Sequence, residues 1–442
     1  MAKQLTEQEQ IEADKLYLKY PSASRSVWSY PMLQALENGV KGGKWFSLKD
    51  KIHDIKTLLI SFNAVAKNKG SCGIDNQTIE MFESKMGENL RNLQQKLSNN
   101  EYEPIPVKRV YIDKPGSKDK RPLGIPAVSQ RIVENAIKQL IEPIFEKDFL
   151  ECSYGFRPNR GAKGALEEVT RNLAEGYIHI IDADIKGYFD SINHALLMSF
   201  VEMRIADGWV LNILKKFLSN DIMDDVKRWT PEMGSPQGSV ISPLLSNIYL
   251  HRLDTRMIQE GFRIIRYADD FVVMCKSAQE AEKGLAIVKE VMDMLMLKLH
   301  PEKTKIVEVK GDNGFEFLGY LFTENRRRPK DKSIKSLRMK IRDKTSRNCG
   351  TSLEETIESL NATLRGWYGY FKHIKNASWV FKATDQMIRR RLRSILAKFE
   401  KKRGSHRMLD NFKISNDFFH KQGLFSLLEA HNKTVILERG KL

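Results

Sequence analysis

The sequence has 442 residues, of which 41% are hydrophobic and 29% charged, and its 73 Lys and Arg outnumber its 56 Asp and Glu to give a net charge of +17. These proportions describe a globular chain with room for two or three domains, and they exclude a wholly disordered or fibrous protein. The sequence shows no bilayer-spanning apolar run, no signal-peptide pattern and no CxxC pair among its four cysteines, so we expect a reducing, cytoplasmic location and neither a membrane protein nor a disulfide or zinc scaffold.

The order of predicted elements indicates an α+β body. Residues 1–45 are predicted to be mainly helical, and 53–100 continue as helix around a glycine-rich turn. Prolines and glycines punctuate short extended segments over 104–126, and helical spacing returns at 130–146. The remaining predictions are a β-branched strand over 177–185, a helix from Asn193, a helix over 242–259, two strands around a tight turn within 262–274, a helix over 278–295 and an extended segment over 315–322.

The excess positive charge lies in the C-terminal quarter. Residues 1–320 contain 44 basic and 44 acidic side chains, whereas the last 122 contain 29 and 12. In 331–344 and 388–399, apolar residues recur at helical intervals and Lys and Arg occupy the other faces. We interpret these segments as basic helices that pack on a core and bind nucleic acid in a salt-dependent way. A solvated basic surface would look the same, as would a membrane-surface helix outside a folded context.

Two acidic clusters carry the strongest chemical signal. Asp269 and Asp270 follow Tyr267-Ala268 between apolar segments, where a hairpin would reverse direction. Adjacent carboxylates repel each other and are best tolerated with a cation, although Asp is also common in ordinary turns. Asp182 and Asp184 share one face of the strand over 177–185. Carboxylates from both clusters would suit Mg²⁺, and two such ions would support in-line phosphoryl transfer.

A loop rich in glycine and proline, residues 234–244, separates the two clusters. Its glycines would let the backbone approach a base or ribose closely. The same residues also predict the start of a helix, with Ser242 as the N-cap and Pro243 at the first helical position. Both interpretations can hold together.

Six motifs occur in one order along the chain, namely 120–126 (KRPLGIP), 153–160 (SYGFRPNR), 184–189 (DIKGYF), 236–238 (PQG), 267–270 (YADD) and 317–320 (FLGY). Over about residues 50–400 this order resembles the reverse transcriptases encoded by bacterial group II introns. The resemblance implies a right-hand polymerase with an N-terminal extension (1–50), fingers (51–175), a palm with interleaved fingers elements (176–325) and a basic, mainly helical thumb or maturase (X) domain (326–442). The turn at 69–75 is similar to the family's extra fingers segment.

The resemblance implies a catalytic metal site. Asp184, Asp269 and Asp270 match the family's catalytic, metal-binding aspartates, with the backbone carbonyl of Ile185 as a further ligand. They would hold two Mg²⁺ ions, for which Mn²⁺ could substitute. The family's pattern selects Asp184 rather than Asp182, because its aromatic residue five positions on is Phe189. The Phe189 ring would exclude a ribose 2′-hydroxyl. The resemblance therefore implies a preference for deoxynucleotides and disfavours an RNA-synthesising polymerase.

Further positions match the family's substrate contacts. Lys114 and Arg121 would bind the incoming triphosphate, and Gln237 would lie near the nascent base pair. Lys303 would protonate pyrophosphate, or is an ordinary surface lysine. The implied template and primer contacts are Arg157, Arg160, Gly319 in the primer-gripping turn, Arg365, Arg389 and Arg390. Arg157 could equally pair with an acidic neighbour in the core, and the aromatic residues of 360–371 are predicted to be core.

The resemblance predicts an RNA-directed DNA polymerase that extends a DNA or RNA primer on an RNA template, such as group II intron RNA, with deoxynucleoside triphosphates. The alternative is an RNA-binding maturase that assists splicing, and domesticated relatives in defence or DNA repair share the same polymerase body. No paired cysteines follow residue 427, so we expect no endonuclease domain. We expect a bacterial, cytoplasmic protein without a membrane partner, associated with the nucleoid when it is bound to DNA.

Overall fold

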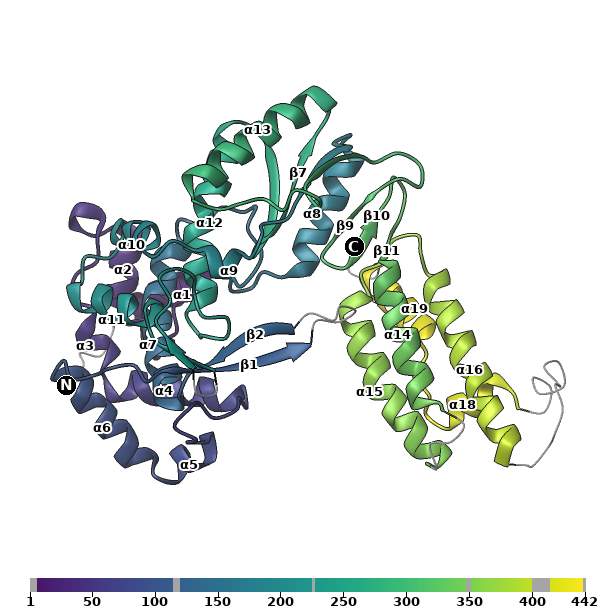
Figure 1. Cartoon of the computed structure of the whole chain (residues 1–442), viewed down its shortest axis with the longest axis horizontal. Coiled ribbons are helices and arrows are strands. Elements are labelled where there is room, and N and C mark those ends of the chain that lie inside the picture. The colour runs from purple at the N-terminus through teal and green to yellow at the C-terminus, as the bar shows by residue number, and fades with distance from the viewer. Residues whose placement is uncertain (1–5, 114–119, 225–226, 347–350, 400–413, 440–442) are drawn as a thin grey trace. The chain divides into compact units, whose positions relative to one another are not determined.

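A computed structural model describes residues 6–113, 120–224, 227–346, 351–399 and 414–439. The chain divides into two compact units, residues 1–306 and 307–442, which are described separately (Figure 1). Lys114, a predicted triphosphate contact, lies outside the described residues. In the part of the chain that the structure describes, no helix combines the length and apolarity needed to span a membrane.

The first unit begins with helices and ends with a sheet flanked by helices. Its helices are α1 (Glu7–Lys19), α2 (Tyr30–Asn38), η1 (Lys41–Gly43), α3 (Lys49–Ile52), α4 (Ile55–Lys67), α5 (Ile79–Ser84), α6 (Met86–Ser98), α7 (Val128–Glu146), α8 (Ala162–Ala174), α9 (Tyr188–Ser191), α10 (His194–Glu202), α11 (Gly208–Leu218), α12 (Ser242–Gln259) and α13 (Ala278–Met294). Its strands are β1 (Val107–Asp113), β2 (Lys120–Ile125), β3 (His179–Ala183), β4 (Ile222–Asp224), β5 (Lys227–Trp229), β6 (Arg263–Tyr267) and β7 (Asp270–Cys275). Strand β8 (Lys305–Glu308) contains the boundary between the units.

These strands form two sheets. One has the order β2-β1-β4-β5, with β1 antiparallel to β2 and parallel to β4. The other has the order β6-β7-β3-β8, with β7 antiparallel to both of its neighbours β6 and β3. Helix α12 contacts β6, and α13 contacts β3 and β7 (Figure 1). Alternate strand residues such as Ile181, Phe271 and Val273 join the buried cluster that contains these helices, as the twofold period of a strand requires.

The N-terminal helices are part of the same hydrophobic core. Trp28 is 1% exposed, and its indole Nε1 donates to the carbonyl of Gln139 on α7 at 3.1 Å. Its ring packs edge-on against Trp45, with the ring centroids 5.5 Å apart. Leu33 and Leu36 on α2 join the cluster that contains α7, α12 and β7. The segment to which no motif is assigned therefore covers the core of the first unit.

Several predicted elements are confirmed. The helix predicted over 242–259 is α12 with the same bounds, and the two strands predicted around a turn within 262–274 are β6 and β7.

The N-cap prediction is wrong, because Ile241 is the N-cap and Ser242 is the first helical residue. The Ser242 hydroxyl is instead used by the preceding loop, since it accepts from Ser235 Oγ at 2.6 Å and donates to the carbonyl of Pro236 at 3.0 Å.

The second unit combines a small sheet with a bundle of helices. Its elements are β9 (Phe315–Phe317), β10 (Tyr320–Phe322), β11 (Arg327–Pro329), α14 (Asp331–Lys344), α15 (Leu353–Phe371), α16 (Trp379–Phe399), α18 (Asn416–Lys421) and α19 (Leu427–Arg439). Helix α14 contacts α15 and α16, and α16 contacts α19 (Figure 1). Ile334, Leu337 and Ile341 of α14 are buried, whereas Lys335 and Arg338 are exposed. Helix α14 is therefore the basic amphipathic helix that its sequence predicts.

Candidate active site

A two-residue turn presents Asp269 and Asp270. Strands β6 and β7 pair with Tyr267 opposite Asp270, so Ala268 and Asp269 alone form the turn. Ala268 has a φ of 59°, and the tight turns that suit the twist of a hairpin need such positive values. Asp269 therefore lies at the tip of the hairpin and Asp270 at the start of β7.

Asp184 follows the end of the neighbouring strand. In the antiparallel pairing of β3 with β7, Ala183 lies opposite Phe271. One residue further in the same register, Asp184 comes opposite Asp270, and residues directly opposite each other share a face of the sheet. Asp182 shares that face, two residues further from the end. The backbone therefore brings Asp184 and the hairpin turn to the same end of the sheet.

The Asp184 side chain is held by Lys303. Lys303 Nζ donates to Asp184 Oδ2 at 2.6 Å, and both side chains are exposed to solvent. His300 N donates to the Asp184 carbonyl at 2.7 Å, so the segment that carries Lys303 runs beside the end of β3. Among the described residues, no group of three or more His, Cys, Asp and Glu side chains is arranged to hold a metal ion. In this arrangement Asp184 has an ammonium group as its charged partner.

The predicted backbone ligand is the carbonyl of Ile185. Ile185 forms an antiparallel bridge with Leu299, and the two hydrogen bonds of that bridge are made by the flanking residues, His300 N to the Asp184 carbonyl and Lys186 N to the Lys298 carbonyl. The bridge therefore does not use the Ile185 carbonyl, and its role as a ligand stays a prediction.

The surroundings of Asp269 disfavour its negative charge. Burial raises the pKa of the Asp269 carboxyl above its ordinary value, and the charge of Asp184 acts in the same direction. Arg121 and Arg266 lower the pKa of Asp269, because a positive charge favours the ionised carboxyl. A divalent cation would act as these arginines do, and carboxylate oxygens are the ligands that Mg²⁺ and Mn²⁺ prefer. The donor set therefore fits a divalent metal in its chemistry.

Arg121 and Gln237 lie together near the hairpin. Arg121 Nε donates to Gln237 Oε1 at 3.1 Å, and Arg121 is close enough to affect the pKa of Asp269. The loop that carries Gln237 is docked on β2, because Gly124 N donates to the Gln237 carbonyl at 2.6 Å. Gly238 has a φ of 115°, and a Cβ there would collide with the Gly124 carbonyl. This close approach explains why the motif needs a glycine at that position.

Phe189, on α9, contacts the start of the same loop through its backbone. Ser235 N donates to the Phe189 carbonyl at 2.7 Å, and the partly buried Phe189 ring packs edge-on against Tyr188, with the ring centroids 5.2 Å apart. The loop of residues 234–238 therefore joins the backbone of Phe189, the predicted sugar-selecting residue, to Gln237. A cavity of about 430 Å³ adjoins this loop, and its lining includes Gln237.

A buried carboxylate that sequence reasoning misses anchors the loop. Glu134 on α7 is fully buried, and this burial raises the pKa of its carboxyl. Its Oε2 accepts from Ser239 Oγ at 2.8 Å and from Val240 N at 2.7 Å, and its Oε1 accepts from Gln130 Nε2 at 2.9 Å. The sequence does contain a signal for this contact. Gln130 and Glu134 lie within an apolar helix, and polar side chains buried there need hydrogen-bond partners.

Replacing Glu134 with glutamine is expected to loosen this loop. One acceptor oxygen becomes an NH₂ group, so at least one of the three donors loses its partner, which should lower the free energy of unfolding by about 1–3 kcal/mol. We also expect a higher KM for deoxynucleotides, because the loop carries Gln237. Urea unfolding and steady-state kinetics measure the two effects. Glu142→Gln is the matched control, since Glu142 lies on the same helix as Glu134 and pairs with Lys138, also on α7, at 3.3 Å. Equal KM values for both variants would contradict the expectation.

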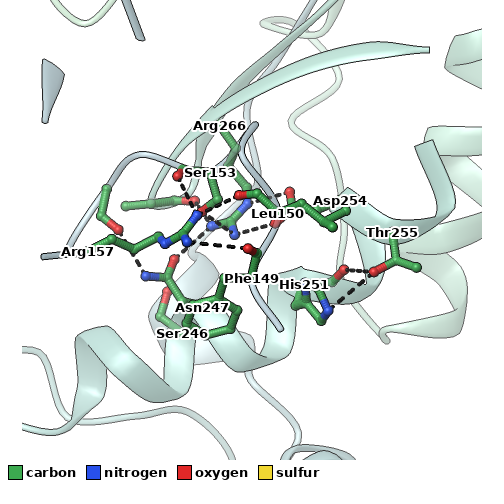
Figure 2. Close-up of polar contacts among 12 residues, drawn as sticks. Phe149, Leu150, Ser153, Arg157, Ser246, Asn247, His251, Asp254, Thr255 and Arg266 are labelled. Atoms are coloured by element: carbon green, nitrogen blue, oxygen red, sulfur yellow. Dashed lines mark hydrogen bonds and ion pairs between the residues drawn. The ribbon is translucent and has the colours of Figure 1, made fainter. Parts of the chain in front are cut away.

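The prediction that Arg157 contacts the template is corrected. Its side chain is 3% exposed, and its Nη2 pairs with Glu146 Oε1 at 2.7 Å. Figure 2 shows the guanidinium directed at backbone carbonyls, and it donates to those of Phe149, Leu150 and Ser153. With its donors engaged in the core, Arg157 has none to offer a phosphate. The structure supports the alternative interpretation, in which Arg157 pairs with an acidic neighbour in the core.

Arg160 is only partly buried. Its guanidinium pairs with Glu151, donates to the Glu151 carbonyl at 2.9 Å and lies over the Tyr154 ring. Its contact with the template stays a prediction.

In the second unit, Gly319 occupies the turn between β9 and β10. Phe317 pairs with Tyr320, so Leu318 and Gly319 form a two-residue turn, and both have positive φ values. Tyr370 of α15 donates from its hydroxyl to the Leu318 carbonyl at 2.9 Å. The turn is therefore fixed against α15, and its role in gripping the primer stays a prediction.

The predicted arginine contacts in the second unit differ in exposure. Arg365 and Arg390 are exposed, and Arg389 is half-buried. Arg393, which the helical pattern places on an outward basic face, is instead buried, and its Nε donates to the carbonyl of Ile414 at 2.9 Å. This part of the outward-facing prediction is wrong, because the Arg393 guanidinium is bonded to residues just before and at the start of α18, where its Nη2 also donates to Asn416 Oδ1 at 2.8 Å.

Two family descriptions match the chain in succession. "Reverse transcriptase (RNA-dependent DNA polymerase)" matches residues 112–322, and "Group II intron, maturase-specific domain" matches residues 334–412. Protein YkfC of Escherichia coli (strain K12) is 33% identical over 327 residues, which cover 65% of this chain and 84% of YkfC. The chain belongs to the group II intron reverse transcriptase and maturase family.

Other relatives of this reverse transcriptase are matched over smaller shares. Group II intron-encoded protein LtrA of Lactococcus lactis subsp. cremoris is 35% identical over 202 residues, which cover 45% of this chain and 33% of LtrA. A chain of the solved "Partial Cas6-RT-Cas1--Cas2 complex" is similar over 56% of this chain and 42% of its own length, with a TM-score of 0.37 and 23% identity. By family the protein is an RNA-directed DNA polymerase, and the predicted right-hand α+β fold class is confirmed.

Proposed function

We propose that this reverse transcriptase extends a DNA or RNA primer on an RNA template with deoxynucleoside triphosphates, using Asp184, Asp269 and Asp270 to hold two Mg²⁺ ions. The observation that carries the proposal is the register of β6, β7 and β3, which brings all three aspartates to the same end of the sheet. When bound, such ions would supply Lewis-acid chemistry that favours attack by the primer hydroxyl and departure of pyrophosphate. In this structure one oxygen of the Asp184 carboxylate, Oδ2, accepts from Lys303.

The other residues of the site would orient the nucleotide. Arg121 would bind the triphosphate, because a guanidinium makes charge-assisted hydrogen bonds to phosphate oxygens. Gln237 lies on the loop whose Ser235 is bonded to the Phe189 carbonyl of α9, so we propose that a nucleotide held by Arg121 would meet the Gln237 amide at its base pair and the Phe189 ring at its sugar. Lys303 would protonate the leaving pyrophosphate, and its exposed ammonium beside Asp184 supports that role.

A second function rests on the C-terminal part of the chain. Residues 334–412 match the maturase-specific domain, and α14 presents exposed Lys and Arg opposite its buried face. We propose that this surface, with Arg365, Arg389 and Arg390, binds RNA such as group II intron RNA and supports splicing. The boundaries proposed for the parts remain 51–175 for the fingers, 176–325 for the palm and 326–442 for the thumb.

Primer extension on an RNA template tests the polymerase proposal. We expect the protein to extend an annealed DNA primer with deoxynucleotides in Mg²⁺, to stop when EDTA removes the metal, and to recover when Mg²⁺ or Mn²⁺ is restored. A splicing reaction with a candidate intron RNA, run in parallel, tests the maturase proposal. RNA binding and splicing without any extension would refute the polymerase proposal and favour the maturase.

A further inference from the structure

Arg266 is a charged residue inside an apolar strand. It lies on β6, one residue before the hairpin segment Tyr267–Asp270, and its side chain is completely buried. A buried guanidinium is costly unless every N–H group has a partner. The question is which groups satisfy it and what they achieve together.

The guanidinium is held by three side chains from two other segments (Figure 2). Asp254 of α12 accepts from Nε at 2.7 Å and from Nη2 at 2.5 Å, which is a bidentate pair between fully buried groups. Asn247, also on α12, accepts from Nη1 at 2.9 Å. Ser153 Oγ accepts from Nη2 at 2.8 Å. These contacts fix the plane of the guanidinium within the core.

The remaining N–H group reaches the catalytic turn. Arg266 Nη1 donates to the carbonyl of Ala268 at 2.9 Å, and Ala268 is the turn residue with a positive φ. Gly155 lies against the same turn, since a Cβ there would collide with Ala268 N, and the Gly155 carbonyl accepts from Asn247 Nδ2 at 2.9 Å. The turn is therefore held on both sides by one buried network.

We propose that Arg266 is a positioning residue, whose guanidinium, fixed by Asp254, Asn247 and Ser153, holds the Ala268 carbonyl so that Asp269 and Asp270 present their carboxylates to a divalent cation. This inference rests on the proposed function of those aspartates. It also explains the 153–155 segment of the SYGFRPNR motif, because Ser153 completes the network and Gly155 makes room for the turn.

A plain stabilising role is the competing explanation, and Arg157 separates the two. Arg157 is a second buried arginine in the same region, paired with Glu146 and bonded to the carbonyls of Leu150 and Ser153. No hydrogen bond joins its side chain to the turn at 268–270 among the contacts of the described residues in Figure 2. Arg157→Lys should therefore lower stability without changing the turn, whereas Arg266→Lys should do both.

The experiment titrates Mn²⁺ into the full chain, with free Mn²⁺ followed by electron paramagnetic resonance and Asp269→Asn giving the background of unrelated sites. Because residues that orient metal ligands typically change metal affinity by about 10- to 100-fold, we expect a loss of that size for Arg266→Lys. We expect wild-type affinity for Arg157→Lys at a temperature where both variants are folded. The Mg²⁺ concentration for half-maximal primer extension should rise in parallel for Arg266→Lys alone.

A milder variant covers the case in which Arg266→Lys does not fold. Ser153→Ala removes one acceptor and leaves the Arg266–Asp254 pair intact, so it should fold and weaken Mn²⁺ binding in the same direction by a smaller factor. Wild-type Mn²⁺ affinity in both Arg266→Lys and Ser153→Ala would overturn the inference. A wild-type protein that binds Mn²⁺ through Asp269 but extends no primer would refute the proposed polymerase and leave the inference standing on the titration. Failure to bind Mn²⁺ through Asp269 would refute both.

Discussion

Replacing Asp269 with asparagine is expected to abolish DNA synthesis while leaving the affinity for RNA unchanged. A metal ion contributes several kcal/mol to stabilising charge in phosphoryl transfer, and each loss of about 1.4 kcal/mol lowers the rate roughly tenfold. Losing a ligand of the metals should therefore reduce extension by about 10³-fold or more. RNA affinity should persist, because the exposed basic residues of α14 and α16 do not depend on the Asp269 charge.

The same substitution should not destabilise the fold. Burial raises the pKa of Asp269 in the folded protein, so its ionised form opposes folding increasingly as the pH rises through that pKa. At neutral pH that cost is present in the wild type and absent in Asp269→Asn. Thermal unfolding should therefore show equal or greater stability for the variant. Asp293→Asn, at an exposed position on α13, is the matched control and should behave as wild type in extension and RNA binding. Near-wild-type extension by Asp269→Asn would refute the metal-site assignment.

Truncating Phe189 is expected to admit ribonucleotides. A ribose carries a 2′-hydroxyl where the ring would stand, and Phe189→Val or Phe189→Ala would open that space. Two substrates that differ by one small group typically differ by about 10- to 200-fold in kcat/KM. The preference for deoxynucleotides over ribonucleotides should therefore fall by a factor in that range. Single-nucleotide incorporation with each nucleotide at several concentrations measures it.

A second partly buried phenylalanine provides the control for this effect. Phe200 on α10 packs against the same hydrophobic core as Phe189, and its ring lies against Tyr249 and the Arg252 guanidinium. Phe200→Val should lower stability to a similar extent and leave sugar selection unchanged. If Phe189→Val keeps the wild-type ratio of deoxynucleotide to ribonucleotide incorporation, the ring does not select the sugar.

Local patterns predicted the elements that long periodic segments specify. Helix α12 was predictable because apolar residues recur over eighteen positions after a proline, and the hairpin because apolar runs flank a polar turn. The strands β4 and β5 were not, because three residues each are too few to display a period. The pairing of β4 with β1, and of β5 with β4, depends on tertiary contacts that a linear pattern does not contain.

The sequence allowed us to predict which residues belong to the candidate site, but not which residues each of them contacts. The contact between Lys303 and Asp184 joins positions 119 residues apart, and only the folded sheet brings them together. Arg157 and Arg160 look alike in sequence, yet one is buried and the other partly exposed, because the first faces Glu146 and backbone carbonyls. Arg266 could have been flagged, since a basic residue between apolar strand positions needs a buried acid, but the sequence does not name Asp254 as that acid.

The place of Trp28 has a consequence for where the polymerase unit can be cut. The family match begins at residue 112, but the indole of Trp28 is bonded to α7, the helix whose Glu134 anchors the Gln237 loop. A fragment that begins at residue 112 would lack Trp28. It would leave a cavity beside α7 and expose the hydrophobic core there to solvent. We therefore expect substitutions in the first forty-five residues to alter the Gln237 loop indirectly, through the packing of α7.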